Sequence, residues 1–244
     1  MRVGVQRKKR TPRDDAARRR RRSAVRVDRV RVASFQRRLL AWYARHGRDL
    51  PWRRTRDPYA ILVSEIMLQQ TQVRRVLEYY PRFLARYPTV ADLAVASTPA
   101  VRESWHGIGY YRRAANLRRA AQHIAERHGG RFPADVAALR QLPGVGRYTA
   151  GAVASFAFGQ DAPILDTNAA RVLARVFGPG RRRGRTARLW ALAEATLPAG
   201  RAYEFNQAIM DLGALICRAR KPTCPVCPVR RTCRAFERAA ARQR

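Results

Sequence analysis

Acidic residues are scarce in this sequence of 244 residues. It contains 17 Asp and Glu against 51 Lys and Arg, which gives a formal net charge of +34 at pH 7. An excess of this size is more than solubility requires. It indicates a polyanionic partner, for which nucleic acid is the leading candidate.

Long apolar runs are also absent. No run approaches the roughly 18 residues that indicate a transmembrane helix. The first residues contain no apolar segment of the kind that a secretory signal carries. We therefore expect a cytoplasmic, nucleoid-associated protein with no membrane partner.

Cysteine is rare and confined to one segment. The four cysteines follow the pattern Cys217-x6-Cys224-x2-Cys227-x5-Cys233, with prolines between them. In a reducing compartment they are not expected to form disulfides. Four thiolates at these spacings can bind one metal centre, and the spacing alone fits zinc and a [4Fe–4S] cluster equally well.

The alternation of apolar and polar residues that is typical of strands is missing, as are internal repeats. Apolar residues recur at helical spacing in short segments that Gly and Pro separate, so the sequence predicts an all-α protein. Residues 1–32 are rich in Arg and poor in large apolar side chains, and we expect them to be disordered. This tail is either a non-specific DNA tether or a passive extension.

The helix boundaries follow from capping residues. Ser34 is the expected N-cap of the first helix, and Asp57 followed by Pro58 starts the second. A basic loop is expected at residues 179–188. Further helices are expected over residues 73–87, 90–97, 114–128, 169–176, 190–197 and 205–216.

Glu65 lies in the apolar helix that starts after Asp57. Such a carboxylate either faces water or is buried with a raised pKa. The polar run Gln69-Gln-Thr-Gln72 follows and suits hydrogen bonding to exposed base edges. The loop Gly107–Arg113 combines glycines, aromatics and arginines, which fits a wedge that enters DNA, unless the aromatics belong to the core.

The segment Leu142-Pro-Gly-Val-Gly146 precedes a helix of small residues. It predicts a helix–hairpin–helix, in which amides at a helix N-terminus bind a phosphate, although a plain helix connection has the same pattern. Further along, Asp166 is a candidate catalyst for chemistry on the sugar.

Together these motifs resemble the helix–hairpin–helix base-excision DNA glycosylases that carry an iron–sulfur cluster. The resemblance is strongest to the MutY-like adenine glycosylases, with endonuclease III and the thymine-mismatch glycosylases as relatives. It extends from Phe35 to Cys233. The matching stretches are Leu50-Pro-Trp-Arg, Asp57-Pro-Tyr, Ser64-Glu-Ile-Met-Leu-Gln-Gln-Thr-Gln-Val73, Gly107-Ile-Gly-Tyr-Tyr111, Leu142-Pro-Gly-Val-Gly146, Ile164-Leu-Asp-Thr-Asn168, Phe205-Asn-Gln-Ala-Ile-Met-Asp-Leu-Gly213 and the cysteine array.

The resemblance implies a two-lobed, all-α fold with the substrate base flipped into the cleft between the lobes. Residues 60–166 would form a six-helix barrel lobe. Residues 33–59, with the first helix, and residues 167–244 would form the iron–sulfur lobe. The resemblance also favours [4Fe–4S] over zinc.

Hydrolysis of an N-glycosidic bond needs a general acid near the base and a carboxylate near the sugar. The resemblance assigns these roles to Glu65 and Asp166, with Tyr148 and Asn168 beside Asp166. Tyr148 stands where bifunctional relatives carry a lysine, so a monofunctional enzyme is expected. Substrate-binding positions are Trp52, Arg53, Gln70 and Asp211, and DNA-binding positions are Gln69, Tyr110, Gly144, Val145 and Gly146.

The resemblance implies a monomeric glycosylase that acts on double-stranded DNA and excises adenine opposite 8-oxoguanine or guanine. Two departures bear on this expectation. Only Arg234–Arg244 follows Cys233, whereas MutY proteins commonly continue into a Nudix-like domain that recognises 8-oxoguanine. Thr167 stands where MutY usually has Gly and thymine glycosylases have Ala. The alternatives are a thymine or uracil mismatch glycosylase and a non-catalytic DNA-binding iron–sulfur protein.

Overall fold

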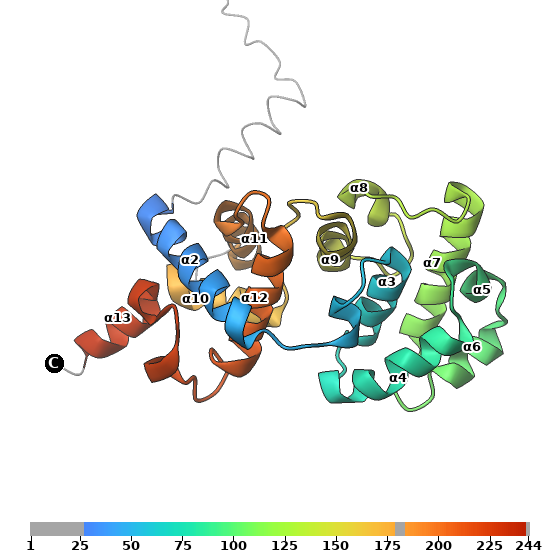
Figure 1. The fold of residues 1–244 in the computed structure, drawn as a ribbon, viewed down its shortest axis with the longest axis horizontal. Coiled ribbons are helices and arrows are strands. Elements are labelled where there is room, and N and C mark those ends of the chain that lie inside the picture. Colours follow the sequence, from blue (N-terminus) through green and yellow to red (C-terminus); the bar gives the residue numbers. More distant parts are fainter. Residues whose placement is uncertain (1–26, 179–183, 243–244) are drawn as a thin grey trace, which may run out of the picture.

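The computed structural model describes residues 27–178 and 184–242, and this part of the chain is helical without strands (Figure 1). The expected all-α class is confirmed. The helices are α2 (Arg29–His46), α3 (Pro58–Met67), α4 (Val73–Arg86), α5 (Val90–Val95), α6 (Thr98–Ser104), α7 (Arg112–His128), α8 (Val136–Leu139), α9 (Arg147–Phe158), α10 (Thr167–Phe177), α11 (Arg185–Thr196), α12 (Ala202–Leu215) and α13 (Arg234–Ala241), with 3-10 turns at Pro51–Arg53, Cys224–Val226 and Arg230–Thr232.

Helices α2 and α3 both begin at aspartates. Asp57 accepts hydrogen bonds from the amides of Tyr59 and Ala60, at 3.0 and 3.2 Å, which confirms the expected start of α3. Asp28 accepts from the amide of Val30 at 2.9 Å, so α2 begins earlier than expected. Ser34 is therefore inside a helix, and the prediction of disorder is wrong for residues 29–32. Residues 1–26 lie outside the described chain.

Other boundaries also differ from expectation. Ser97 accepts a hydrogen bond from the amide of Ala100 at 3.3 Å and starts α6, so the expected helix over residues 90–97 ends at Val95. Helix α11 begins at Arg185, within the expected basic loop. Residues 179–183 of that loop lie outside the described chain.

The buried apolar side chains form two cores. The first extends from Leu50 to Ile164 and is built from α3 to α9, and the second joins α2 to α10, α11 and α12. Figure 1 shows the two groups of helices side by side. The chain passes between the cores after Trp42 and again before Ala169, so the segment from Leu50 to Tyr59 packs in the first core rather than the second.

Helix α3 is buried on every side, from Tyr59 to Met67. A helix that is apolar all round has no face for water, so its one carboxylate, on Glu65, is carried into the interior. Helix α12 is also largely buried, and it packs against α2 and α10 and contacts α9 across the two cores. These two helices and the start of α10 position the site. Among the described residues, no helix combines the length and apolar character needed to cross a bilayer.

Candidate active site between the two cores

A cavity of about 660 Å³ lies where the two cores meet, and its volume is within the usual range of ligand pockets. It collects predicted site residues from segments far apart in the chain. The predicted residues that line it are Trp52, Arg53, Glu65, Gln69, Gln70, Tyr148, Asp166 and Asn168. Thr167 also lines it.

Glu65 is 4% exposed, and its Oε2 has no hydrogen-bond partner among the described residues. Burial raises the pKa of Glu65 from its ordinary value to about 7. Tyr148 lowers this pKa, the charge of Asp166 raises it and Arg53 lowers it, each by less than burial raises it. Near neutral pH a substantial fraction of Glu65 therefore carries a proton, which a general acid requires.

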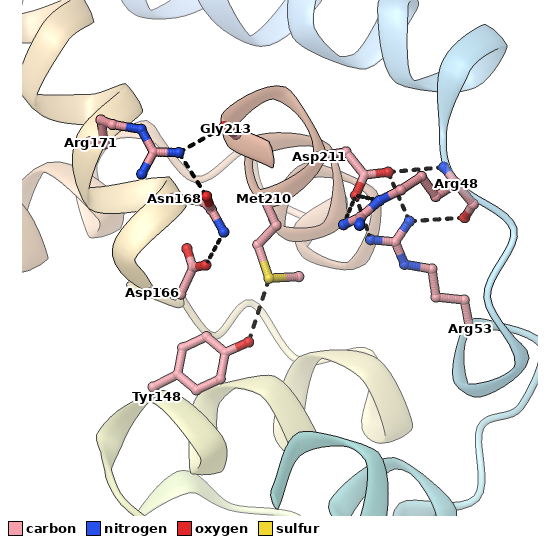
Figure 2. Close-up of polar contacts among 9 residues, drawn as sticks. All are labelled: Arg48, Arg53, Tyr148, Asp166, Asn168, Arg171, Met210, Asp211 and Gly213. Carbon is pink, nitrogen blue, oxygen red and sulfur yellow. Dashed lines mark hydrogen bonds and ion pairs between the residues drawn. The ribbon is translucent and has the colours of Figure 1, made fainter. Parts of the chain in front are cut away.

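Tyr148 belongs to the first turn of α9 and faces helix α12 across the cavity. Its hydroxyl lies 3.4 Å from Sδ of Met210, a weak acceptor (Figure 2). Burial raises the pKa of Tyr148 well above its ordinary value, and the charges of Glu65 and Asp166 act in the same direction. Tyr148 is therefore a neutral hydroxyl that lies within the influence of both carboxyl groups.

Asp166 is the N-cap of α10, where one carboxylate oxygen accepts a hydrogen bond from the amide of Ala169 at 2.6 Å. The other oxygen accepts from Nδ2 of Asn168 at 2.8 Å. Arg171 holds Asn168 by donating to its Oδ1 at 2.7 Å, and also donates to the carbonyl of Gly213 at 2.7 Å (Figure 2). These bonds fix the orientation of the Asp166 carboxylate before any ligand binds.

Gly213 permits this contact between α10 and α12. A Cβ at Gly213 would lie 2.6 Å from the Cβ of Asn168, which is closer than two carbon atoms approach. The absence of a side chain lets Asn168 pack directly on the backbone of α12. Gly213 therefore allows α10 and α12 to approach closely. Its presence in the matched segment Phe205–Gly213 did not reveal this role.

Asp211 was expected to bind substrate, but it does not line the cavity and its side chain is fully buried. Arg48 donates to Oδ1 at 2.6 and 2.8 Å, and Arg53 donates to both oxygens at 2.8 and 2.9 Å (Figure 2). Burial by itself would raise the pKa of Asp211, but the two arginines outweigh it and lower the pKa. The prediction of a direct contact is corrected accordingly: Asp211 holds Arg53 at the wall of the cavity.

The hairpin turns at Gly144, whose φ is +79° and whose added Cβ would lie 2.7 Å from the Cβ of Asn116. Gly144 and Gly146 are exposed, and Gly146 starts α9 without a side chain that could cap it. Val145 differs, because its side chain is buried and its amide donates to the carbonyl of Leu142 at 3.1 Å. The expectation that the Val145 amide binds a phosphate is therefore wrong, since that amide is used inside the turn.

Tyr110 lies outside the cavity and is 60% exposed. The neighbouring Trp105 is fully buried, so the aromatic loop divides between core and surface. A large exposed aromatic side chain suits contact with a partner rather than packing. This placement is compatible with the predicted wedge, for which Tyr110 stays the candidate.

Several cavity residues were not predicted from the sequence. Gln207 is 3% exposed yet lines the cavity, and Met210 and Arg48 line it beside the predicted residues. Gln207 lies one turn before Asp211 on a buried helix. The sequence did offer a signal for Gln207. It is a polar residue within the apolar matched stretch Phe205–Gly213, and a buried polar side chain requires a hydrogen-bond partner.

The four cysteines surround a second cavity of about 360 Å³, whose remaining lining is mostly apolar. All four thiols are free of disulfides, and Nη1 of Arg175 lies 3.3 Å from Sγ of Cys217. Burial raises the pKa of Cys227 to about 11 and also raises that of Cys233. Within the described ranges, no three His, Cys, Asp or Glu side chains are arranged to hold a single metal ion. Four thiols that line one cavity are a donor set that both zinc and a [4Fe–4S] cluster use.

The fold is all-helical with two cores, a glycine hairpin precedes a helix, and a cavity lies between the cores. These features define a helix–hairpin–helix protein. The chain belongs to the HhH-GPD superfamily of base excision DNA repair proteins, whose family model matches residues 63–194.

The similar proteins include adenine and thymine DNA glycosylases. The chain is 45% identical to adenine DNA glycosylase of Homo sapiens, over 88% of this chain and 42% of that protein. It is 42% identical to thymine-DNA glycosylase of Aeropyrum pernix, over 85% of this chain and 96% of that protein. The chain thus spans about two fifths of the human relative and nearly all of the archaeal one.

The fold is also that of solved structures. A thermostable thymine-DNA glycosylase superimposes with a TM-score of 0.80 and 35% identity, over 85% of this chain and 97% of that one. A complex of endonuclease III with DNA superimposes with a TM-score of 0.76 at 24% identity, which bears on the fold alone. The two-lobed helical fold that the sequence predicted is confirmed.

Proposed function

We propose that this protein is a monofunctional DNA glycosylase that excises adenine mispaired with guanine or 8-oxoguanine. The observation that carries the proposal is that Glu65 and Asp166, far apart in the chain, line the same cavity. The identity to relatives named adenine DNA glycosylase, 45% for the human protein and 47% for that of Mycobacterium tuberculosis, supports adenine as the substrate.

Glu65 is proposed to protonate the leaving base. An adenine leaves poorly as an anion, and protonation of a ring nitrogen makes it a neutral leaving group. Burial favours the protonated form of Glu65 near pH 7, and its Oε2 has no hydrogen-bond partner among the described residues that would compete with a ring nitrogen. General acids of this kind contribute about a hundredfold to ten-thousandfold in rate.

Asp166 is proposed to stabilise the positive charge that develops on the sugar as the bond breaks. Its carboxylate already accepts two hydrogen bonds from α10, so it needs little reorganisation when the charge appears. Water then attacks the sugar carbon, as in glycoside hydrolysis.

The absence of an amine at the site supports hydrolysis without strand cleavage. In the described part of the chain no lysine lines the cavity, and the family resemblance assigns Tyr148 to the position where bifunctional enzymes carry a lysine. No Schiff base to the sugar can form there, and the expected product is an intact strand with an abasic site.

DNA binding is proposed to use the net charge of +34 and the exposed glycines of the hairpin. Gln69 and Gln70 line the cavity, and Tyr110 is exposed outside it. A flipped adenine would enter between them, with Trp52 and Arg53 on the wall of the cavity.

The four cysteines are proposed to hold a [4Fe–4S] cluster in the cavity that they line. Such a cluster supplies a rigid, charged centre that orders the segment after α12. Arg175 lies beside Cys217 and would compensate the negative charge of the thiolates.

Thymine or uracil opposite guanine is the second candidate substrate. The similarity to the archaeal thymine-DNA glycosylase favours this candidate, because the 42% identity extends over nearly the whole length of that protein. Thr167 at the cavity also differs from the residues that both groups usually carry.

One assay separates the candidates. Purified protein is incubated with duplexes that contain A:8-oxoguanine, A:G, T:G or U:G, and alkali then cleaves abasic sites. Cleavage at adenine alone supports the proposal, and cleavage at pyrimidines alone replaces it with the second candidate. No cleavage in any duplex leaves a non-catalytic DNA-binding protein.

A further inference from the structure

Arg113 is a buried cation without an acidic partner. Its exposed fraction is 8%, and in the described chain neither a hydrogen bond nor an ion pair joins it to a carboxylate. Buried arginines are normally paired with an acid, because an isolated charge is costly to bury. The question is therefore which groups bind the buried guanidinium of Arg113 in place of an acid.

Nη1 of Arg113 donates to carbonyls at the end of α3. It lies 3.1 Å from the carbonyl oxygen of Ile66, 2.8 Å from that of Met67 and close to that of Gln69. Carbonyls at a helix C-terminus lack partners within the helix and carry partial negative charge. They therefore take the place of a carboxylate, at the end of the helix that carries Glu65.

Nη2 of Arg113 contacts a second loop as well as the first. It donates to Oγ1 of Thr71 at 2.9 Å and to the carbonyl of Gly109 at 3.0 Å. The guanidinium also lies 5.3 Å from the ring centre of Tyr110, within range of a cation–π contact. One side chain thus joins the loop after α3 to the loop before α7.

Each of these loops contains a non-glycine residue in the left-handed backbone region. Gln70 has φ +58° and Tyr110 has φ +51°, and the described residues contain one other such case, Lys221. This conformation is unfavourable for residues with a Cβ and persists only where neighbouring contacts impose it. Arg113 binds the carbonyl that directly precedes each residue, those of Gln69 and Gly109.

We propose that Arg113 is a positioning residue that holds Gln70 and Tyr110 in these conformations at a fixed separation. Both side chains are exposed, so they are set to enter a distorted duplex before DNA binds. Such preorganisation lowers the ordering cost of binding. Lysine cannot replace the arginine, because only the planar guanidinium presents donors to both loops at once. The role in DNA recognition rests on the proposed function, whereas the fixing of the loops does not.

The first test uses the whole 244-residue chain without DNA. Amide hydrogen exchange is compared in wild type, Arg113→Lys and Arg112→Lys, since Arg112 is the exposed neighbour on the same helix turn. We expect exchange in residues 68–72 and 106–111 to be at least about tenfold faster in Arg113→Lys, with other helices and the Arg112→Lys protein unchanged. Wild-type exchange in both loops of Arg113→Lys overturns the proposal.

The second test measures the dissociation constants for an A:G duplex and for the matched A:T duplex. We expect Arg113→Lys to reduce the preference for A:G about tenfold while binding to A:T changes about twofold or less. Arg112→Lys should retain the preference. An Arg113→Lys protein with the wild-type preference overturns the role in recognition. If wild type itself shows no preference, the proposed function fails, and the exchange experiment still decides whether Arg113 fixes the loops.

A milder variant avoids the risk that Arg113→Lys unfolds. Thr71→Val removes one acceptor of Arg113 and retains the shape of the side chain and the cation itself. We expect faster exchange confined to residues 68–72, by a smaller factor than in Arg113→Lys. Unchanged exchange in that loop contradicts the proposal.

Discussion

Asn168 donates a hydrogen bond from Nδ2 to Oδ2 of Asp166 at 2.8 Å, while the other carboxylate oxygen caps α10. The carboxylate therefore has two functions, one in folding and one in the proposed chemistry. The two can be separated, because asparagine caps helices about as well as aspartate but carries no charge.

Replacing Asp166 with Asn should leave stability within about 1 kcal/mol of wild type, because the cap is retained. The rate of adenine release should fall at least about a hundredfold, because the charge that stabilises the sugar cation is lost. Single-turnover cleavage and denaturant unfolding measure the two effects. Asp166→Ala is the control that loses the cap as well, and it should unfold more easily by about 1 kcal/mol. A near wild-type rate for Asp166→Asn would exclude the proposed role.

The rate of base release should decrease as the pH rises above 7. Burial raises the pKa of Glu65 to about 7, and only the protonated form can donate. The single-turnover rate should therefore fall about tenfold per pH unit well above the pKa. Glu65→Gln should bind the duplex but release base too slowly to measure. A wild-type rate that stays level between pH 7 and 9 contradicts the role of Glu65.

The same group should make stability depend on pH. In the folded protein Glu65 keeps its proton up to a pKa of about 7, whereas its ordinary value is 4.5. Its contribution to stability is full below pH 4.5 and is lost as the pH rises through 7. Relative to Glu65→Gln, wild type should lose up to about 3 kcal/mol in unfolding free energy between pH 4 and pH 8. Denaturant titrations of both proteins test this, and parallel pH profiles would contradict it.

Tyr148→Lys should introduce strand cleavage. Wild type should leave the abasic strand intact until alkali is added, because no amine lines the cavity in the described chain. A lysine at residue 148 would place an amine near the sugar, and burial would lower its pKa and favour the nucleophilic form. Trapping with borohydride should then link the variant to DNA and leave wild type unlinked. Trapping of wild type would show that another amine reaches the sugar.

The purified protein should be brown and contain iron and acid-labile sulfide, about four of each per chain. Cys224→Ser should lose iron and unfold at lower denaturant concentration, because the apolar cavity that the cysteines line would lose its centre. Val226→Ser is the matched control, since Val226 is 66% exposed in the same segment and carries no thiol. Zinc without sulfide in the wild-type protein would identify the other metal centre.

Much of the site could be predicted because its residues lie in short motifs. Glu65 and Asp166 were named from local sequence and Tyr148 and Asn168 from the family resemblance, and all four line one cavity. The burial of Glu65 was left open, although α3 is apolar on every side and that pattern favours a buried helix.

Other features could not be predicted, because they depend on partners far away in the chain. Asp211 was taken for a base contact, and only the fold shows that Arg48 and Arg53 occupy it. The amide of Val145 was expected to be free, and only the turn geometry shows that it is used. The backbone carbonyls that bind Arg113 have no sequence signature, since every residue has a backbone carbonyl.

By itself, the sequence determined the helical class, the excess of positive charge, the hairpin and the identities of the candidate catalytic side chains. These depend on residue type and local spacing, which a single chain displays directly. Only the tertiary structure decided the state of each carboxyl group. Glu65 is buried with a raised pKa, Asp211 is held by arginines and Asp166 caps a helix. Protonation and pairing depend on desolvation and on neighbours brought together by packing, and neither exists until the two cores have formed.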